Sequence, residues 1–219
     1  MLAIDKYVLL NTARLPLVYK WIMPKALHRL DSETKQVFIT FDDGPTPGVS
    51  EKALDLLAHY QAKATFFCLG QNAEKHPELF NKIQSAGHTI GNHSFSHPDG
   101  WKTNNTDYFL DIEKAEKTIS SHLFRPPYGK LSLSQYLHLK KKFTIVLWDT
   151  LSLDYNQNVD TGFCWEIIKK NTRPGSIIVF HDSIKAAPRM IPVLEKTLNW
   201  LSESGFEMKA LSSKPMSHS

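Results

Sequence analysis

The sequence predicts a single α/β domain built on a mostly parallel sheet that is either covered by helices or closed as a barrel. Three observations support this prediction. Patterns typical of strands and helices alternate along the chain at roughly 25 to 30 residues per unit. No segment rich in Gly, Pro or Ser divides the chain. Polar clusters follow several of the expected strands, at the edge where parallel sheets carry ligand sites.

Seven segments have the β-branched and aromatic content of strands, or lie between turn signals at strand-like spacing. The first is rich in Val, Phe, Ile and Thr and stops at Gly44-Pro45. The expected strands are 36–41, 64–69, 88–91, 124–126, 143–148, 176–180 and 206–210.

Six segments between these strands have the apolar period or the end signals of helices. In 106–121, for example, Ile112, Ala115 and Ile119 fall on one face. Ser132 and Gln135 have the spacing of a capping box, which opens another helix. The expected helices are 50–60, 78–86, 106–121, the one that begins after Ser132, 160–170 and 191–204.

Composition excludes several protein classes. With 219 residues, 42% of them hydrophobic, and a net charge of +4, the chain is neither disordered nor a small disulfide scaffold. It has no long basic run of the kind that binds nucleic acid. It also has no apolar run near the ~18 residues of an integral membrane segment. Cys68 and Cys164 lie far apart among apolar neighbours, so we expect two buried free thiols.

The two ends of the chain differ from the middle. Residues 1–34 mix aromatic side chains such as Tyr7 and Trp21 with Lys and Arg, so we expect an extension that packs on the domain or lies on a membrane surface. No clear signal peptide is visible, which favours a cytoplasmic or peripheral membrane location. Residues 212–219 have the composition of a frayed tail.

Polar residues gather just past the carboxyl ends of the expected strands. Because these ends meet at one edge of a parallel sheet, the clusters predict a single site there. The clusters are Asp42 with Asp43, His93 with His97, Arg125, Asp149 with Asp154, and His181 with Asp182.

The histidine pair and the adjacent acids suit a metal ion. His93 and His97 are four residues apart, so on a helical turn both imidazoles would point the same way. Asp42 and Asp43 repel each other unless a cation or an arginine neutralises them, although a plain surface turn would also carry such residues. Two His and one Asp form the open three-ligand pattern of catalytic zinc, which leaves the second Asp as a general base.

Arg125 and His181 each have an ordinary and a functional interpretation. Arg125 precedes a stiff Pro126-Pro127 pair and makes either a loop salt bridge or a fixed contact that holds one carboxylate in place. His181 is either a satisfied core residue or, beside an acid such as Asp154, a protonated general acid.

Five segments now carry a resemblance to a known family. They occur in the order of the five motifs of the NodB-homology polysaccharide deacetylases, carbohydrate esterase family four, which the chain resembles over about residues 35–211. The segments are Thr40-Phe41-Asp42-Asp43-Gly44-Pro45, His93-Ser94-Phe95-Ser96-His97, Arg125-Pro126-Pro127-Tyr128-Gly129, Trp148 through Asp154-Tyr155, and Val179-Phe180-His181-Asp182.

The resemblance implies a fold, a reaction and a cofactor. The fold is a distorted (β/α) barrel with about seven parallel strands, in agreement with the strand count above. The reaction removes N-acetyl groups from amino sugars of a chitin-like or peptidoglycan-like glycan and releases acetate. The cofactor is a divalent metal, usually zinc, with cobalt, nickel or manganese as alternatives, and the resemblance assigns it to Asp43, His93 and His97.

The resemblance also implies catalytic roles. Asp42 matches the catalytic base, and Arg125 matches the residue that orients it. His181 matches the general acid, and Asp154 matches the acid that tunes His181.

Three further positions follow from the same motifs. The backbone N–H of Tyr128 matches the donor that helps to hold the oxyanion, and Val179 matches the aliphatic residue that contacts the acetyl methyl group. Tyr155 stands where the family often has Trp, so the groove wall differs there. Trp101 belongs to no motif, and we expect it in the core rather than as a sugar-stacking platform.

Two other functions compete with this interpretation. One is a different amide hydrolase of the same superfamily, such as a deformylase acting on a lipid-linked sugar or an enzyme that opens cyclic amides. The other is a sugar-binding protein that has lost catalysis, although the chain retains the acid, the base and the metal ligands. Neither the sugar nor the oligomeric state follows from the sequence.

Overall fold

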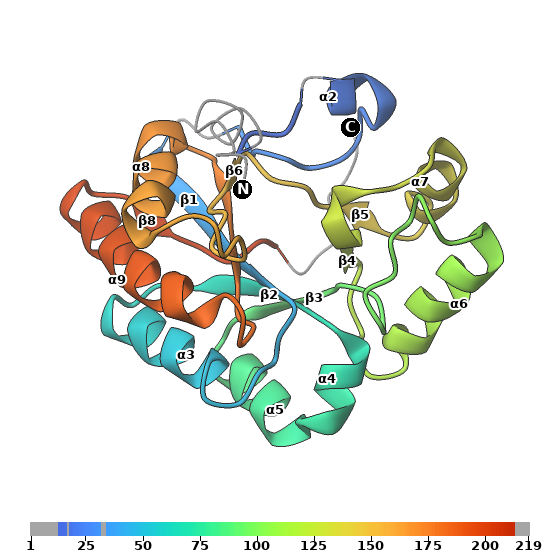
Figure 1. Cartoon of the computed structure of the whole chain (residues 1–219), viewed down its shortest axis with the longest axis horizontal. Coiled ribbons are helices and arrows are strands. Elements are labelled where there is room, and N and C mark those ends of the chain that lie inside the picture. Colours follow the sequence, from blue (N-terminus) through green and yellow to red (C-terminus); the bar gives the residue numbers. More distant parts are fainter. Residues whose placement is uncertain (1–12, 17, 32–33, 213–219) are drawn as a thin grey trace.

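Eight parallel strands of the described chain form one sheet that curls into a half-barrel, shown in the computed structural model of Figure 1. The structure describes residues 13–16, 18–31 and 34–212, so the predictions for residues 1–12 and 213–219 lie outside it. Seven strands follow the order β5-β4-β3-β2-β1-β7-β6, and β8 pairs with β1. The strands are β1 (Gln36–Asp42), β2 (Ala64–Cys68), β3 (Thr89–Asn92), β4 (Leu123–Phe124), β5 (Thr144–Ile145), β6 (Thr150–Leu151), β7 (Ile177–His181) and β8 (Glu207–Met208). The predicted α/β class and distorted barrel are confirmed.

Helices surround the strands, as Figure 1 shows. Helix α9 packs against α3 and α8 on one side of the view, and α6 and α7 lie on the other side. The helices are α2 (Val18–Ile22), α3 (Ser50–His59), α4 (Gly70–Lys75), α5 (Pro77–Ser85), α6 (Asn105–Glu116), α7 (Leu133–Leu139), α8 (Thr161–Asn171) and α9 (Ala187–Glu203), with a 3₁₀ turn at Pro127–Gly129. Among the described residues, no helix is both long enough and apolar enough to span a membrane.

The centre of the sheet is buried on both faces: helices cover one face, and on the other Phe38 and Phe67 cluster with Leu27, Leu30 and Leu211. Strand β1 is apolar along most of its length, and Phe41 stacks between Phe66 of β2 and Phe180 of β7, with ring centroids 4.7 and 5.9 Å apart. Parallel register places the last residue of β1, Asp42, beside His181, the last residue of β7. The packing of the core therefore fixes two polar side chains at the sheet edge.

Of the predicted strand 143–148, only Thr144–Ile145 is a strand, β5, and a separate short strand, β6 (Thr150–Leu151), follows it. Residues after β5 leave the sheet because they pair with the N-terminal segment: Leu27 forms a parallel bridge with Val146 and accepts a hydrogen bond from the Leu147 N–H at 2.7 Å. The chain then rejoins the sheet as β6 beside β7. A pattern within 143–148 could not reveal this, because the partner lies more than 100 residues away.

Several helix boundaries also differ from the predictions. Helix α4 was not predicted, α6 ends at Glu116, and α9 begins at Ala187 with Pro192 inside it. The capping box of Ser132 and Gln135 is confirmed at the start of α7.

The described part of the N-terminal extension packs against the domain. Arg29 forms an antiparallel bridge with Ser176, and the Ala13 carbonyl accepts a hydrogen bond from the Leu151 N–H at 2.8 Å. The domain boundaries at residues 35 and 211 stay predictions. Cys68 and Cys164 are buried free thiols, as expected.

Candidate active site

The carboxyl ends of β1, β3, β4 and β7 open onto one cavity of about 550 Å³. Polar residues from the first, second and fifth motifs line it: Asp42, Asp43, His93, His97 and His181. The expectation that these clusters share one edge of the sheet therefore holds for those five residues.

Asp43, His93 and His97 form a cluster that could hold a metal ion, with one ligand atom from each residue and all three atoms within 4.8 Å of one another. Asp43 Oδ1 lies 3.8 Å from His93 Nε2 and 3.4 Å from His97 Nε2. One carboxylate and two imidazoles match the donor set of a catalytic zinc or a related divalent cation.

The tautomer of His93 and the charge of His97 suit metal binding. His93 is buried, and its Nδ1 lies 2.7 Å from the Arg125 carbonyl, which fixes the proton on Nδ1 and leaves the Nε2 lone pair facing Asp43. Burial and the neighbouring His93 lower the pKa of His97 to about 4, although Asp43 and Asp42 act in the opposite direction. At neutral pH His97 is therefore an uncharged ligand.

The two histidines do not lie on a helical turn, so that prediction was wrong. Residues 93–97 form a loop in which Ser94 and His97 have φ of 70° and 65°. Asp111 of α6 holds this loop: its Oδ1 accepts the N–H of Phe95 at 2.7 Å and the N–H of Ser96 at 3.1 Å. The imidazoles converge because of this loop conformation, with ring centroids 5.0 Å apart.

Asp43 also stands in the left-handed region, with φ of 81°. The side-chain amide of Asn72, on α4, donates to the Asp43 carbonyl at 2.7 Å and holds this strained turn. The sequence analysis did not identify Asn72, because the short helix that carries it was not predicted.

The next residue, Gly44, is held by the buried carboxylate of Asp182. Asp182 Oδ1 accepts the Gly44 N–H at 3.0 Å, and the Ser50 hydroxyl donates to Oδ2. A Cβ on Gly44 would overlap the Asp182 carboxylate, so the close approach requires glycine. Burial raises the pKa of Asp182 and the Ser50 hydrogen bond lowers it, but burial is the larger effect and the pKa is about 7. The sequence analysis did not identify this role for Ser50 or Asp182.

Asp42 is paired with a buried arginine. Arg125 Nη1 lies 2.6 Å from Asp42 Oδ1, and Arg125 is 0% exposed. Its other N–H groups bond to Thr40 Oγ1 and to the carbonyls of Val146 and Leu147. Burial by itself raises the pKa of Asp42, but the Arg125 guanidinium outweighs it and holds the pKa below its ordinary value.

An aromatic ring packs against the Arg125 guanidinium. The Arg125 guanidinium lies 4.1 Å from the centroid of Phe67, and a Cβ on Gly91 would overlap that ring. Gly91 thus leaves space for Phe67, and Phe67 contributes a cation–π contact to the buried charge.

His181 is held by Asp154 through two hydrogen bonds. Its Nδ1 lies 2.7 Å from Asp154 Oδ1, and its backbone N–H donates to Oδ2 at 2.8 Å. Burial alone lowers the pKa of His181, but the fully buried Asp154 carboxylate raises it to about 9. His181 is therefore protonated at neutral pH, and Nδ1 is the nitrogen engaged by Asp154.

Aromatic side chains form part of the cavity wall. Tyr128 has φ of 58°, and its ring centroid lies 4.6 Å from that of His97; the ring centroids of Tyr155 and His181 are 4.8 Å apart. Val179 is buried and is not among the cavity-lining residues, whereas Leu151, its partner on β6, is. The sequence analysis did not identify Leu151.

Two sequence expectations are corrected by the structure. Trp101 is 60% exposed rather than in the core, and its indole N–H donates to the Leu131 carbonyl. Asp149 lies just before β6, near the amino ends of β6 and β7, where it pairs with Arg173 at 2.8 Å and Ser176 at 2.7 Å. Asp149 therefore serves a structural ion pair rather than the cavity.

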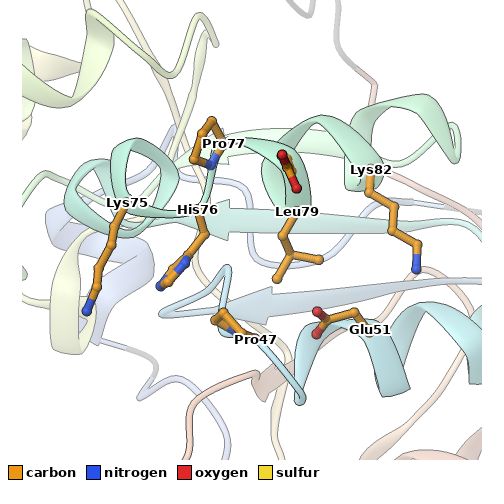
Figure 2. A pocket seen from close by; sticks show the side chains of 8 residues that line it. Pro47, Glu51, Lys75, His76, Pro77, Leu79 and Lys82 are labelled. Atoms are coloured by element: carbon orange, nitrogen blue, oxygen red, sulfur yellow. The ribbon is translucent and has the colours of Figure 1, made fainter.

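A second cleft, of about 530 Å³, lies between the start of α3 and the junction of α4 and α5 (Figure 2). Its lining carries charges of both signs, Glu51 and Glu78 together with Lys75 and Lys82. None of the metal-site cluster lines this cleft, so it does not belong to the candidate active site.

Known proteins match the chain in sequence and in fold. A family model described as polysaccharide deacetylase matches residues 29–145. The chain is 35% identical over 175 residues to a peptidoglycan-N-acetylglucosamine deacetylase of Bacillus cereus, covering 73% of this chain and 63% of that protein, so it spans less than two thirds of that relative. It is 34% identical over 164 residues to a chitooligosaccharide deacetylase of Azorhizobium caulinodans, covering 70% and 77%.

A solved structure shares the fold closely. It is a peptidoglycan N-acetylglucosamine deacetylase in complex with 4-naphthalen-1-yl-N-oxidanyl-benzamide. Its TM-score is 0.81 at 30% identity, covering 92% of this chain and 100% of the other. With the family model, the relatives and the fold in agreement, the chain belongs to the polysaccharide deacetylase family.

Proposed function

We propose that this chain is a metal-dependent hydrolase that removes N-acetyl groups from the amino sugars of a peptidoglycan-like or chitin-like glycan and releases acetate. One observation carries the proposal. A single cavity holds an ionised carboxylate, Asp42, a protonated imidazole, His181, and the Asp-His-His cluster. The similarity to a peptidoglycan-N-acetylglucosamine deacetylase and to a chitooligosaccharide deacetylase supports this class of substrate.

The donor set fits a divalent cation, with zinc as the first choice. Asp43, His93 and His97 would hold it through one carboxylate oxygen and two Nε2 atoms. Their charge and tautomers suit this role, since His97 is neutral and the Arg125 carbonyl fixes the tautomer of His93. When bound, such a cation lowers the pKa of water and polarises a carbonyl oxygen.

Asp42 acts as the general base in this proposal. It accepts a proton from the attacking water at its carboxylate, which the Arg125 guanidinium keeps ionised. Arg125 also fixes the direction of the carboxylate, because it is bound to Thr40 and to two backbone carbonyls and cannot swing. Arg125 is thus a positioning residue rather than a proton donor.

His181 acts as the general acid. Asp154 accepts a hydrogen bond from Nδ1–H. The proton on Nε2 is therefore the one that His181 donates to the nitrogen of the departing amino sugar. The pKa of about 9 keeps that proton in place at neutral pH, and the carbon–nitrogen bond breaks as the amine takes the proton.

The cavity wall positions the acetyl group and the sugar. In this proposal the Tyr128 N–H donates to the oxyanion that develops on the carbonyl oxygen. Val179 backs the apolar wall behind the acetyl methyl group, and Tyr155 lies beside His181 where the sugar passes.

Product analysis with a matched set of substrates tests the proposal. The set comprises N-acetylglucosamine oligomers, peptidoglycan fragments, an acetylated xylan, an N-formyl sugar and a cyclic amide. We expect acetate and a free amine from the first two. Formate release alone, or opening of the cyclic amide alone, would assign the chain to another reaction of its superfamily. Turnover of none of them, with metal bound, would indicate a non-catalytic protein.

A further inference from the structure

The outer face of helix α2 is apolar and unpartnered within the described structure. Helix α2 reads Val-Tyr-Lys-Trp-Ile. Its inner side is anchored by the sequence that follows, since Met23 is buried. Its outer face, defined by Val18, Trp21 and Ile22, is exposed, and Trp21 is 86% exposed. A largely exposed indole between two exposed aliphatic residues is an unusual use of apolar surface.

The segment that carries this face borders the active-site cavity. Leu15, Pro16 and Tyr19, from the same segment, line that cavity. A second exposed apolar residue, Ile184, lies between Ser183 and Lys185, which line the cavity from the loop after β7. Two segments distant in sequence thus expose apolar side chains around one opening.

The sequence of this segment is basic: residues 18–28 contain Lys20 and Lys25 and no acidic residue. Lys25 is exposed, and its amino group makes no ion pair among the described residues. Arg14 and Arg29 do not add to this charge, because Arg14 acts on Asp149 and Arg29 is paired with Asp31. Lys185 adds a further cation next to Ile184. Apolar side chains interleaved with cations are complementary to a surface that is negatively charged and apolar beneath.

We propose that the outer face of α2 and the adjacent cations dock the protein onto an anionic lipid bilayer, with the mouth of the active-site cavity turned toward the membrane. Trp21 inserts at the level of the lipid headgroups, where an indole is favoured because one part is apolar and its N–H stays wet. Lys25 contacts lipid phosphates. Docking does not depend on the chemistry proposed above, because none of these residues belongs to the metal cluster or to the acid–base pairs.

Vesicle sedimentation tests this with the full chain. One set of vesicles is pure phosphatidylcholine, and the other contains equal parts of phosphatidylcholine and phosphatidylglycerol. We expect the protein to sediment with the anionic vesicles and to remain in solution with the neutral ones. A protein that stays in solution with both would overturn the proposal.

Two pairs of variants locate the contact. Trp21→Ser should lower the partition coefficient at least about fivefold, from the apolar area it withdraws. Leu110 is an exposed apolar residue on α6, and Leu110→Ser should change the partition coefficient by less than about twofold. Lys25→Glu should also lower it at least about fivefold, whereas Lys82→Glu, on α5 at the other side of the molecule (Figures 1 and 2), should not.

If Trp21→Ser and Leu110→Ser, or Lys25→Glu and Lys82→Glu, lowered the partition coefficient equally, the contact would not be at α2 and the proposal would be overturned. The occupant of the face is tested separately by sedimentation equilibrium without lipid. A dimer that Trp21→Ser dissociates would mean that a second copy of the chain covers this face instead. A monomer at all concentrations used, together with binding to anionic vesicles, supports the membrane.

Discussion

The charge states of Asp42 and His181 are set chiefly by the one hydrogen-bonded partner that each has. Both are buried or nearly so, and burial disfavours the charged form of each. Arg125 reverses that effect for Asp42, and Asp154 reverses it for His181. The outcome is a base that is ionised and an acid that is protonated at the same pH, side by side at the ends of β1 and β7.

The role of Asp42 as base predicts the effect of removing its charge. We expect Asp42→Asn to retain one equivalent of metal, because Asp43 and both histidines are unchanged, and to lower kcat by about 10²–10⁴-fold. Metal content and acetate release measure the two effects. Asp55→Asn, the same substitution on the exposed side of α3, is the control. Near-normal turnover in Asp42→Asn would mean that another group takes the proton.

The role of Asp154 predicts a shift in the pH profile. The pKa of His181 lies above its ordinary value, so the protonated form is present below about pH 9 and activity falls as the pH rises through that value. In Asp154→Asn, burial is opposed only by the more weakly acting Asp42 and Asp43, and the alkaline limb of kcat should move down by about 1–3 pH units. A lower kcat with an unmoved limb would contradict the assignment of His181.

At this scale, much of the cavity could be predicted from the sequence. The types of residue and their place after strands identified Asp42, Asp43, His93, His97 and His181 as one cluster. Arg125 was placed at this edge because it ends an expected strand, and its role beside Asp42 came from the resemblance. Ser50, Asn72 and Asp111 could not be predicted, since each acts through hydrogen bonds to groups distant in the sequence: the Asp182 carboxylate, the Asp43 carbonyl, and the N–H groups of Phe95 and Ser96. Trp101 was wrongly predicted to lie in the core, because the local sequence does not distinguish a buried indole from an exposed one.

At the scale of elements, the loop 93–97 decides whether the two imidazoles can share an ion. Its positive φ at Ser94 and His97 costs conformational energy, and α6 compensates through the Asp111 carboxylate. Spacing of four residues correctly predicted that the imidazoles would meet but wrongly predicted a helical turn. Spacing alone cannot distinguish the two, because a strained loop also brings residues four apart together.

The loop anchor predicts a loss of metal affinity without any change in the ligands. Asp111→Ala removes the acceptor of two backbone N–H groups, so we expect the loop to loosen and the metal dissociation constant to rise by about 10–100-fold. Titration with a competing chelator measures it. Glu113→Ala, an exposed acid on the same helix, should leave the constant unchanged. An unchanged constant in Asp111→Ala would show that the loop holds its shape without the helix.

At the scale of the whole molecule, distant segments close around one edge of the half-barrel. The N-terminal segment bridges both the chain after β5 and the residue before β7, and it supplies one side of the cavity wall. Strand alternation predicted the parallel sheet, because each strand carries its own local pattern. The break between β5 and β6 could not be predicted, because it depends on pairing with Leu27.

Metal binding to the folded chain should raise its thermal stability. A ligand that binds only the native state at 100 times its dissociation constant adds about 2.7 kcal/mol. For a chain of this length that corresponds to a rise in Tm of about 5–10 °C. We expect this rise on adding zinc to chelator-treated protein and none in Asp43→Ala, as followed by circular dichroism. An equal rise in both proteins would place the stabilising ion elsewhere.

Zinc titration of acetate release tests the central claim most directly. Chelator-treated protein is supplied with zinc in steps, and acetate from N-acetylglucosamine oligomers is measured at each step. The account predicts no release without metal, a linear increase up to one equivalent of zinc per chain, and no recovery in His97→Ala at that ratio. Full acetate release from metal-free protein, or equal recovery in His97→Ala, would contradict it.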